Sequence, residues 1–152
     1  MKKIFLLAAA FVGVFAVKAQ NTAKPEDLAK FNVETHNFGK IKQGTPVTFE
    51  FEIKNITDKP ITVESATASC GCTVPAKPEA PIEPGATGKL KVEYNAAAAA
   101  PFTKDIYVKL SGTDQMKTLH ITGEVLTAEA YEVYMKEKAN TPPSKTGEKP
   151  KN

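Results

Sequence analysis

Residues 47–54, with the sequence VTFEFEIK, alternate between apolar and polar side chains without a break. In an extended chain the four apolar side chains fall on one side and the four polar ones on the other. A strand with one face on a core and one face in water is typical of antiparallel sheets. The segment therefore predicts an antiparallel strand that is buried on one side only.

Shorter runs with the same alternation lie on both sides of this segment, around Phe31, Ile61, Leu90, Ile106 and Leu119. Gly, Pro, Asn and Asp residues, which favour turns, stand between them. Six or seven short strands in about 95 residues need two packed sheets to bury their apolar faces. We expect an all-β fold, an immunoglobulin-like β-sandwich of about seven antiparallel strands over residues 31–126, with a small barrel as the alternative.

The N-terminus has the pattern of a secretory signal peptide. Lys2 and Lys3 precede an apolar run over residues 4–17, and Val17 and Ala19 fit a small-residue cleavage site. A membrane anchor is the alternative, but this run is shorter than the roughly 20 apolar residues that a spanning helix needs. We predict that residues 1–19 are removed, that the mature chain has no membrane span, and that it is exported to the periplasm or secreted.

The remaining segments outside the sandwich differ in composition from it. Residues 20–30 form a polar lead segment, and residues 127–139 contain good helix formers that predict a short helix, with Tyr131 and Met135 packing on one side. Residues 140–152 are rich in Lys and Pro and contain no large apolar side chain, so a disordered tail is expected.

Composition excludes several classes of function. Removal of the signal would leave 17 lysines against 17 acidic residues, and the chain contains no arginine. A balanced surface without arginine is a poor nucleic-acid footprint, so no nucleic-acid partner is expected. The sequence has no HExxH, GxSxG, GxGxxG or P-loop pattern, which predicts no catalytic residue, no cofactor and no enzymatic activity. Asn55-Ile56-Thr57 fits a glycosylation sequon, but such tripeptides are common by chance.

Cys70 and Cys72, separated by Gly71, are the only cysteines. In an oxidising compartment they are a possible disulfide, and Gly71 would permit the tight backbone, with a positive φ, that such a ring demands. A ring of three residues contributes only about 1.5 kcal/mol in the loop-entropy model, so a structural staple is a weak rationale.

Two chemical roles remain open for this pair. A strained disulfide would exchange with partner thiols, although the usual redox spacing has two intervening residues at a helix N-terminus. Two thiolates also suit a soft metal, copper or zinc, but the other available donors, Met116, His36 and His120, are not placed by the sequence. The simplest interpretation is a buried or disulfide-closed turn that shapes a loop.

Five segments together resemble a known family. They are residues 35–41 (THNFGKI) followed by Gly44, residues 49–54 running into Asn55, residues 69–73 (SCGCT), residues 81–85 (PIEPG), and Pro101-Phe102 before a strand. In this order they resemble the bacterial domain of unknown function 1573 family, over roughly residues 31–126. The chain departs from the family pattern at Asn37, where Asp is usual, and at the five alanines of residues 96–100.

The resemblance implies an immunoglobulin-like sandwich in the style of Hydin and major-sperm-protein domains, in proteins that are commonly exported. It implies no reaction, and it gives the motif residues a structural role: His36, Phe38, Gly39, Gly71, Pro84 and Gly85. We therefore predict a non-enzymatic exported module that binds a protein or envelope component or has a structural role. The alternative is a soft-metal or thiol-redox protein that uses Cys70 and Cys72.

Overall fold

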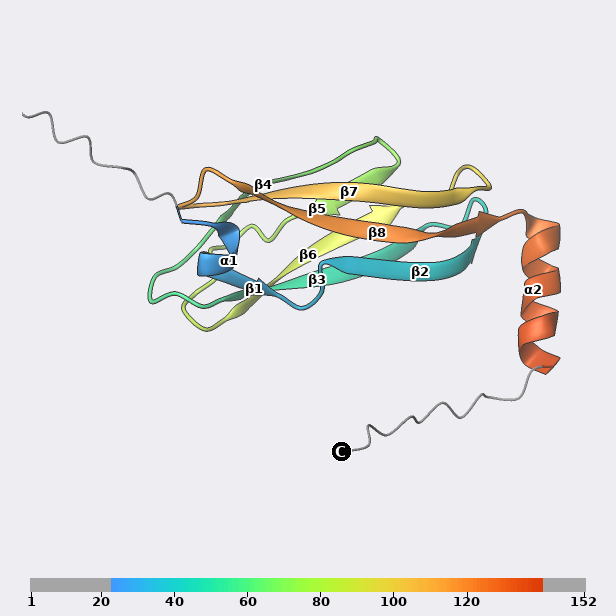
Figure 1. Ribbon diagram of the computed structural model, residues 1–152, viewed down its shortest axis with the longest axis horizontal. Helices are drawn as coiled ribbons and strands as arrows, with labels where there is room; N and C mark the ends of the chain where they lie inside the picture. Colours follow the sequence, from blue (N-terminus) through green and yellow to red (C-terminus); the bar gives the residue numbers. More distant parts are fainter. Residues whose placement is uncertain (1–22, 141–152) are drawn as a thin grey trace, which may run out of the picture.

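A computed structural model describes residues 23–140 (Figure 1). The predicted signal peptide, the start of the lead segment and the predicted tail from residue 141 onward lie outside the described residues. The elements, in chain order, are α1 (Pro25–Leu28), β1 (Ala29–Phe31), β2 (Thr35–Lys42), β3 (Val47–Asn55), β4 (Val63–Ala68), β5 (Thr73–Ala76), β6 (Thr87–Tyr94), β7 (Pro101–Leu110), β8 (Met116–Leu126) and α2 (Ala128–Asn140).

The eight strands form two packed sheets of four, which confirms the all-β sandwich. Sheet A has the order β1-β3-β6-β5, and sheet B has the order β2-β8-β7-β4. The alternating strand β3 pairs with β6 along eight residue pairs, so both strands direct one face into the core. The core contains the largest fully buried apolar side chains: Phe51, Ile53, Leu90, Ile106, Leu110, Leu119 and Ile121.

Two details of the predicted sandwich are corrected. The strands number eight, and β2 pairs with β8 in parallel, so the sandwich is not wholly antiparallel. The expected strand around Phe31 ends at that residue as β1, after which the chain leaves sheet A and enters sheet B as a further strand, β2. At the edge of sheet B, β2 runs in the same direction as β8, so the two strands pair in parallel.

Edge strands change sheet on both sides of the sandwich. On one side, β1 at the edge of sheet A continues into β2 at the edge of sheet B. On the other side, β4 at the edge of sheet B continues into β5 at the edge of sheet A. Cys70, Gly71 and Cys72 lie in this second crossing.

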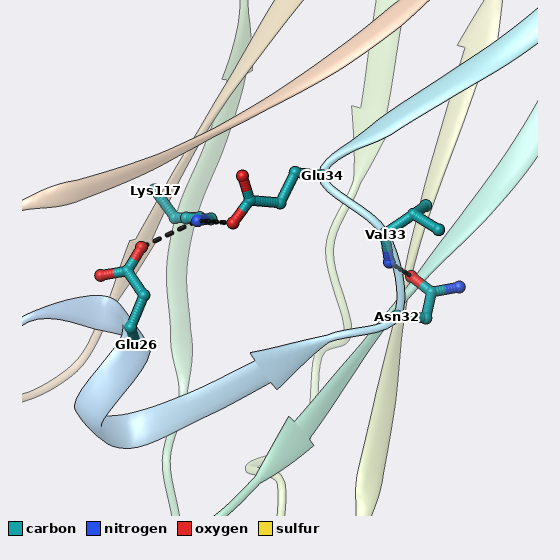
Figure 2. A network of polar contacts seen from close by, with 5 residues as sticks. All are labelled: Glu26, Asn32, Val33, Glu34 and Lys117. Carbon is teal, nitrogen blue, oxygen red and sulfur yellow. Dashed lines mark hydrogen bonds and ion pairs between the residues drawn. The ribbon is translucent and has the colours of Figure 1, made fainter. Parts of the chain in front are cut away.

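A buried lysine fixes the first crossing (Figure 2). Lys117 of β8 occupies a core-facing position and is 8% exposed. Its Nζ donates to Glu26 of α1 at 2.8 Å and also to Glu34, which precedes β2 (Figure 2). Burial acts to lower the pKa of Lys117, but the hydrogen bonds to the two glutamates outweigh it and the pKa is raised. The hydrogen bond from Lys117 likewise lowers the pKa of Glu26. The ammonium is thereby held in its charged form at the rim of the core.

The predicted C-terminal helix is confirmed as α2, which stands at the end of β8, away from α1 (Figure 1). Its contacts to β2 differ from the expected ones. Tyr134 rather than Met135 accompanies Tyr131 on the half-buried side, since Met135 is 43% exposed. Lys40 lies 5.1 Å from the centre of the Tyr134 ring. Neither helix within residues 23–140 has the length and apolar character needed to cross a membrane.

Candidate functional site

The structure joins Cys70 and Cys72 in a disulfide within the turn between β4 and β5. Backbone hydrogen bonds hold this turn independently of the sulfurs. The N–H of Ser69 donates to the carbonyl of Asp105 at 2.9 Å, and the N–H of Asn95 donates to the carbonyl of Cys72 at 3.0 Å. The turn is therefore attached to β7 on one side and to the end of β6 on the other.

Gly71 does not adopt the positive φ that a glycine would permit in this ring. Gly71 is not among the described glycines with a left-handed backbone, which are Gly39, Gly44, Gly85 and Gly112. A Cβ placed on Gly71 would meet no atom within 4 Å, and the residue is exposed. Neither the backbone nor the packing of this chain therefore demands glycine here. Because Gly71 is exposed and has no side chain, no side chain covers the outside of the turn at this residue.

Thr73, the residue that follows the disulfide, is buried and contacts both sulfurs. Its Oγ1 lies 3.7 Å from Sγ of Cys70 and 3.9 Å from Sγ of Cys72, and its side chain is almost fully enclosed. A hydroxyl buried away from water needs a hydrogen-bond partner, and here the partner is sulfur. Sequence reasoning marked the two cysteines but not this hydroxyl.

The other candidate metal donors have contacts or exposure of their own that do not involve the sulfurs. His36 stacks on Phe49 with ring centres 3.6 Å apart, and Met116 is 57% exposed at the start of β8. His120 pairs with Asp105 instead, with 2.8 Å between Nδ1 and Oδ1. Within residues 23–140, no group of three or more His, Cys, Asp or Glu side chains could hold a metal ion. The soft-metal hypothesis gains no further ligand from the fold.

The disulfide turn borders a polar surface on the outer side of sheet B, in which Asp105 is the acidic residue. Asp105 and His120 are cross-strand partners in β7 and β8, and Thr35 of β2 is the next partner of His120. We call this surface the polar face. It consists of Thr35, Thr67, Asp105, Tyr107, Thr118, His120 and Thr122, which alternate with core residues along their strands.

A hollow of about 350 Å³ adjoins the polar face where β2 bulges away from β8. The bulge falls between Asn37 and Lys40, and Gly39 has a φ of 69° there, which explains the glycine of the THNFG motif. Oδ1 of Asn37 accepts the N–H of Gly39 at 2.8 Å, a role that needs an oxygen acceptor and no charge. The hollow is lined by Asn37, Gly39, Lys40, Phe102, Thr122, Gly123 and Glu124.

The aromatic residues of the same motif close one side of the sandwich. His36 stacks on Phe49 of sheet A, and Phe38 meets the edge of His36 with ring centres 4.6 Å apart. Burial lowers the pKa of His36. A neutral imidazole between apolar rings here joins the edges of the two sheets.

Pro84 and Gly85 form the centre of a turn that leads into β6. The N–H of Ala86 donates to the carbonyl of Glu83 at 2.9 Å, and Gly85 has a φ of 74°, as a type II turn requires at its third position. The N–H of Gly85 donates to the carbonyl of Asn55 at 3.1 Å. The PIEPG segment is thus fastened to the end of β3.

Comparison with solved structures supports the fold alone, because all identities are low. A protein of unknown function from Porphyromonas gingivalis matches with a TM-score of 0.56 and 14% identity, over 64% of this chain and 46% of that one. The ASH/PapD-like domain of human CEP192 matches with a TM-score of 0.59 and 8% identity, over 84% and 98%. The VesB protease of Vibrio cholerae matches with a TM-score of 0.53 and 14% identity, over 65% and 32%.

The chain thus spans less than half of the length of the Porphyromonas and Vibrio structures. A search of curated proteins finds no match. The family model described as "Protein of unknown function (DUF1573)" matches residues 29–125, from the first strand to the last. This chain, an immunoglobulin-like sandwich over the matched residues, therefore belongs to the DUF1573 family.

Proposed function

We propose that this chain is an exported, non-enzymatic module that binds another protein or a component of the cell envelope through the polar face of sheet B. The observation that carries the proposal is the difference between the polar face, which is part of the outer side of sheet B, and the outer face of sheet A. The outer face of sheet A consists of exposed, mostly charged side chains: Thr48, Glu50, Glu52, Lys54, Thr87, Lys89, Lys91 and Glu93.

Opposite charges face one another across sheet A. Glu50 is the partner of Lys91 and Glu52 that of Lys89, and Lys89 also forms an ion pair with Glu50 at 2.8 Å. Long charged side chains lose much rotamer freedom and hydration when a partner covers them. This face is typical of a surface that stays in water.

The polar face of sheet B carries fewer charges, since Asp105 is the one acidic residue among its members and none of them is a lysine. It carries short hydroxyl side chains and a central half-buried tyrosine, Tyr107. The centres of protein interfaces are depleted of charge and enriched in tyrosine, and short polar side chains bind at a small entropic cost. The adjoining hollow is a depression beside this otherwise flat surface.

The paired His120 and Asp105 side chains support contact rather than catalysis. Their side chains are 39% and 38% exposed on an open sheet face, where water has free access. Catalytic groups gain most of their effect in sites that exclude water. The pair instead presents a fixed donor and acceptor to a partner.

Export is the second part of the proposal and has its own test. The protein isolated from its native cells is expected to have an intact mass that lacks residues 1–19 and begins at Gln20, because signal peptidase removes the leader on export. Mass spectrometry of cytoplasmic and envelope fractions measures this directly. A full-length mass confined to the cytoplasm would contradict export.

The polar face is tested by capture from the envelope fraction with matched variants. Thr118→Lys combined with Thr122→Lys adds two positive charges to the polar face, and Thr48→Lys combined with Thr87→Lys adds the same charges to sheet A. We expect the first pair to lower partner recovery at least tenfold, because an unpaired charge buried in an interface costs more than the roughly 1.4 kcal/mol that a factor of ten represents, and the second to leave it unchanged.

Quantitative proteomics of the captured material distinguishes the outcomes. Equal recovery by both double variants would move the binding site away from the polar face. Recovery of nothing above background by the unaltered protein would overturn the binding function itself.

A further inference from the structure

The fold does not need the disulfide to form its turn. The bond spans a sequence separation of two, and the crossing from β4 to β5 is already held by the backbone bonds from Ser69 to Asp105 and from Asn95 to Cys72. In the loop-entropy model a ring of three residues contributes only about 1.5 kcal/mol, against about 3 kcal/mol for a loop of 15 residues. A bond with so little structural value calls for another explanation.

We infer that the Cys70–Cys72 disulfide is an exchange site for dithiols of a partner chain, and that Thr73 is its positioning residue. This inference is independent of the polar face, since it rests on the turn alone. Three features of the turn carry it: the Thr73 hydroxyl, the different surroundings of the two cysteines and the exposed Gly71.

The Thr73 hydroxyl is placed to stabilise a sulfur anion. It lies within 4 Å of both sulfurs, and Thr73 is only 4% exposed, so solvent has little access to the contact. A hydrogen bond to a charged acceptor is roughly twice as strong as one between neutral groups, so opening of the disulfide strengthens this contact. In the usual CxxC motif a helix dipole stabilises the thiolate. Here a single hydroxyl would take that role on a strand.

The two cysteines differ in their surroundings. Both are half-buried, but Cys72 packs against the hydrophobic core, whereas Cys70 lies outside that cluster. Gly71 between them is exposed, with open space where a Cβ would stand. These facts assign the attacked sulfur to Cys70 and the leaving sulfur to Cys72.

A partner chain has a place to lie beside the turn. β5, which follows directly, is the edge strand of sheet A and carries the exposed Val74. An extended segment can pair with such an edge through its backbone. We expect a cysteine in that segment to approach the disulfide from the exposed side of Gly71, where no side chain stands in the way.

The exchange balances in two steps. A partner thiolate attacks Sγ of Cys70, the S–S bond breaks, and Cys72 leaves as a thiolate that accepts the Thr73 hydrogen bond. A second partner thiolate then attacks the partner's own sulfur in the mixed disulfide and releases Cys70. The partner dithiol is oxidised to a disulfide, and two electrons and two protons pass to Cys70 and Cys72, which become thiols.

The test uses dithiothreitol as the dithiol and the whole folded protein. Thr73→Val removes the hydroxyl with little change in shape, Thr73→Ser retains it, and Thr87→Val on the outer face of sheet A is the matched control. Disulfide opening is followed by acid quenching, alkylation and mass spectrometry. We expect Thr73→Val to open at least tenfold more slowly than the unaltered protein, and the other two variants to stay within about threefold.

A pH profile separates this role from a merely structural one. The alkylation rate of the reduced protein reports the thiolate, and loss of one hydrogen bond to it should shift the profile of Thr73→Val upward by about one pH unit. An unshifted profile with an unchanged opening rate would remove Thr73 from the mechanism.

The exchange itself is tested without any variant. The unaltered folded protein is expected to open at least tenfold faster than the disulfide-closed peptide Ser-Cys-Gly-Cys-Thr, in which the hydroxyl is not held in place. A folded protein whose disulfide resists dithiothreitol, or opens no faster than the peptide, would overturn the inference even if Thr73→Val failed to fold.

Discussion

Replacing Asn55 with alanine is expected to lower the free energy of unfolding by about 4 kcal/mol, a large part of the stability of a small domain. Asn55 is fully buried at the end of β3. Its Nδ2 donates to the carbonyls of Lys59 and Ile82 at 2.7 and 2.8 Å, and its Oδ1 accepts the N–H and the hydroxyl of Thr57, both at 2.8 Å. Truncation leaves the N–H of Thr57 without its partner, removes one donor from each of the two carbonyls, and opens a cavity.

Asn95→Ala is the matched control. Asn95 is exposed, and its Oδ1 accepts one N–H, that of Ala97, at 3.2 Å. Water can replace this bond, so a loss of less than about 1 kcal/mol is expected. Urea unfolding followed by circular dichroism compares the two variants. Similar midpoints for Asn55→Ala and Asn95→Ala would show that the buried amide does not organise this end of the sandwich.

Gly123→Ala is expected to cost about 2 kcal/mol, because the added methyl group has no room. A Cβ at this position of β8 would lie 2.8 Å from two ring carbons of Phe102 and 2.9 Å from the backbone oxygen of Gly39. The Phe102 ring cannot move aside freely, since it is buried and stacks on Tyr94 with ring centres 4.1 Å apart. The bulge of β2 therefore depends on a glycine in the neighbouring strand.

Gly71→Ala provides the comparison for this variant. Its methyl group would enter open space and its backbone is not left-handed, so a change within about 0.5 kcal/mol is expected. Thermal or urea unfolding of both variants gives the answer. A loss at Gly71 as large as the loss at Gly123 would mean that the disulfide turn is packed more tightly than the structure shows.

The parts of the fold that were predictable are those in which one local pattern settles the structure. Residues 47–54 alternate cleanly because both neighbours of β3 lie in the same sheet and one face meets the core. β2 was missed because its bulge at Gly39 interrupts the alternation, and β5 was missed because it is short and contains Pro75. Edge strands need fewer apolar residues, so their signal is weak.

The candidate site shows the same division. Cys70 and Cys72 are conspicuous in the sequence, whereas the burial of Thr73 follows only from the crossing between the sheets. The contact of Asp105 with His120 requires the register of the β7–β8 hairpin, although a count outward from Gly112 would have placed the two residues near one another. The burial of Lys117 and Asn55 was not predicted, because in the sequence a polar residue at a core position cannot be told from a polar residue at the surface.

The parallel pairing of β2 with β8 has a mechanical consequence. β2 runs away from the α1 end of the sandwich, and β8 runs in the same direction toward α2 at the opposite end (Figure 1). Tension that pulls the start of β2 and the end of β8 apart would slide the two strands along one another instead of peeling them open. The hydrogen bonds between residues 35–42 and 120–126 would then carry the load together, so the domain would resist tension in this direction better than tension that peels the strands apart.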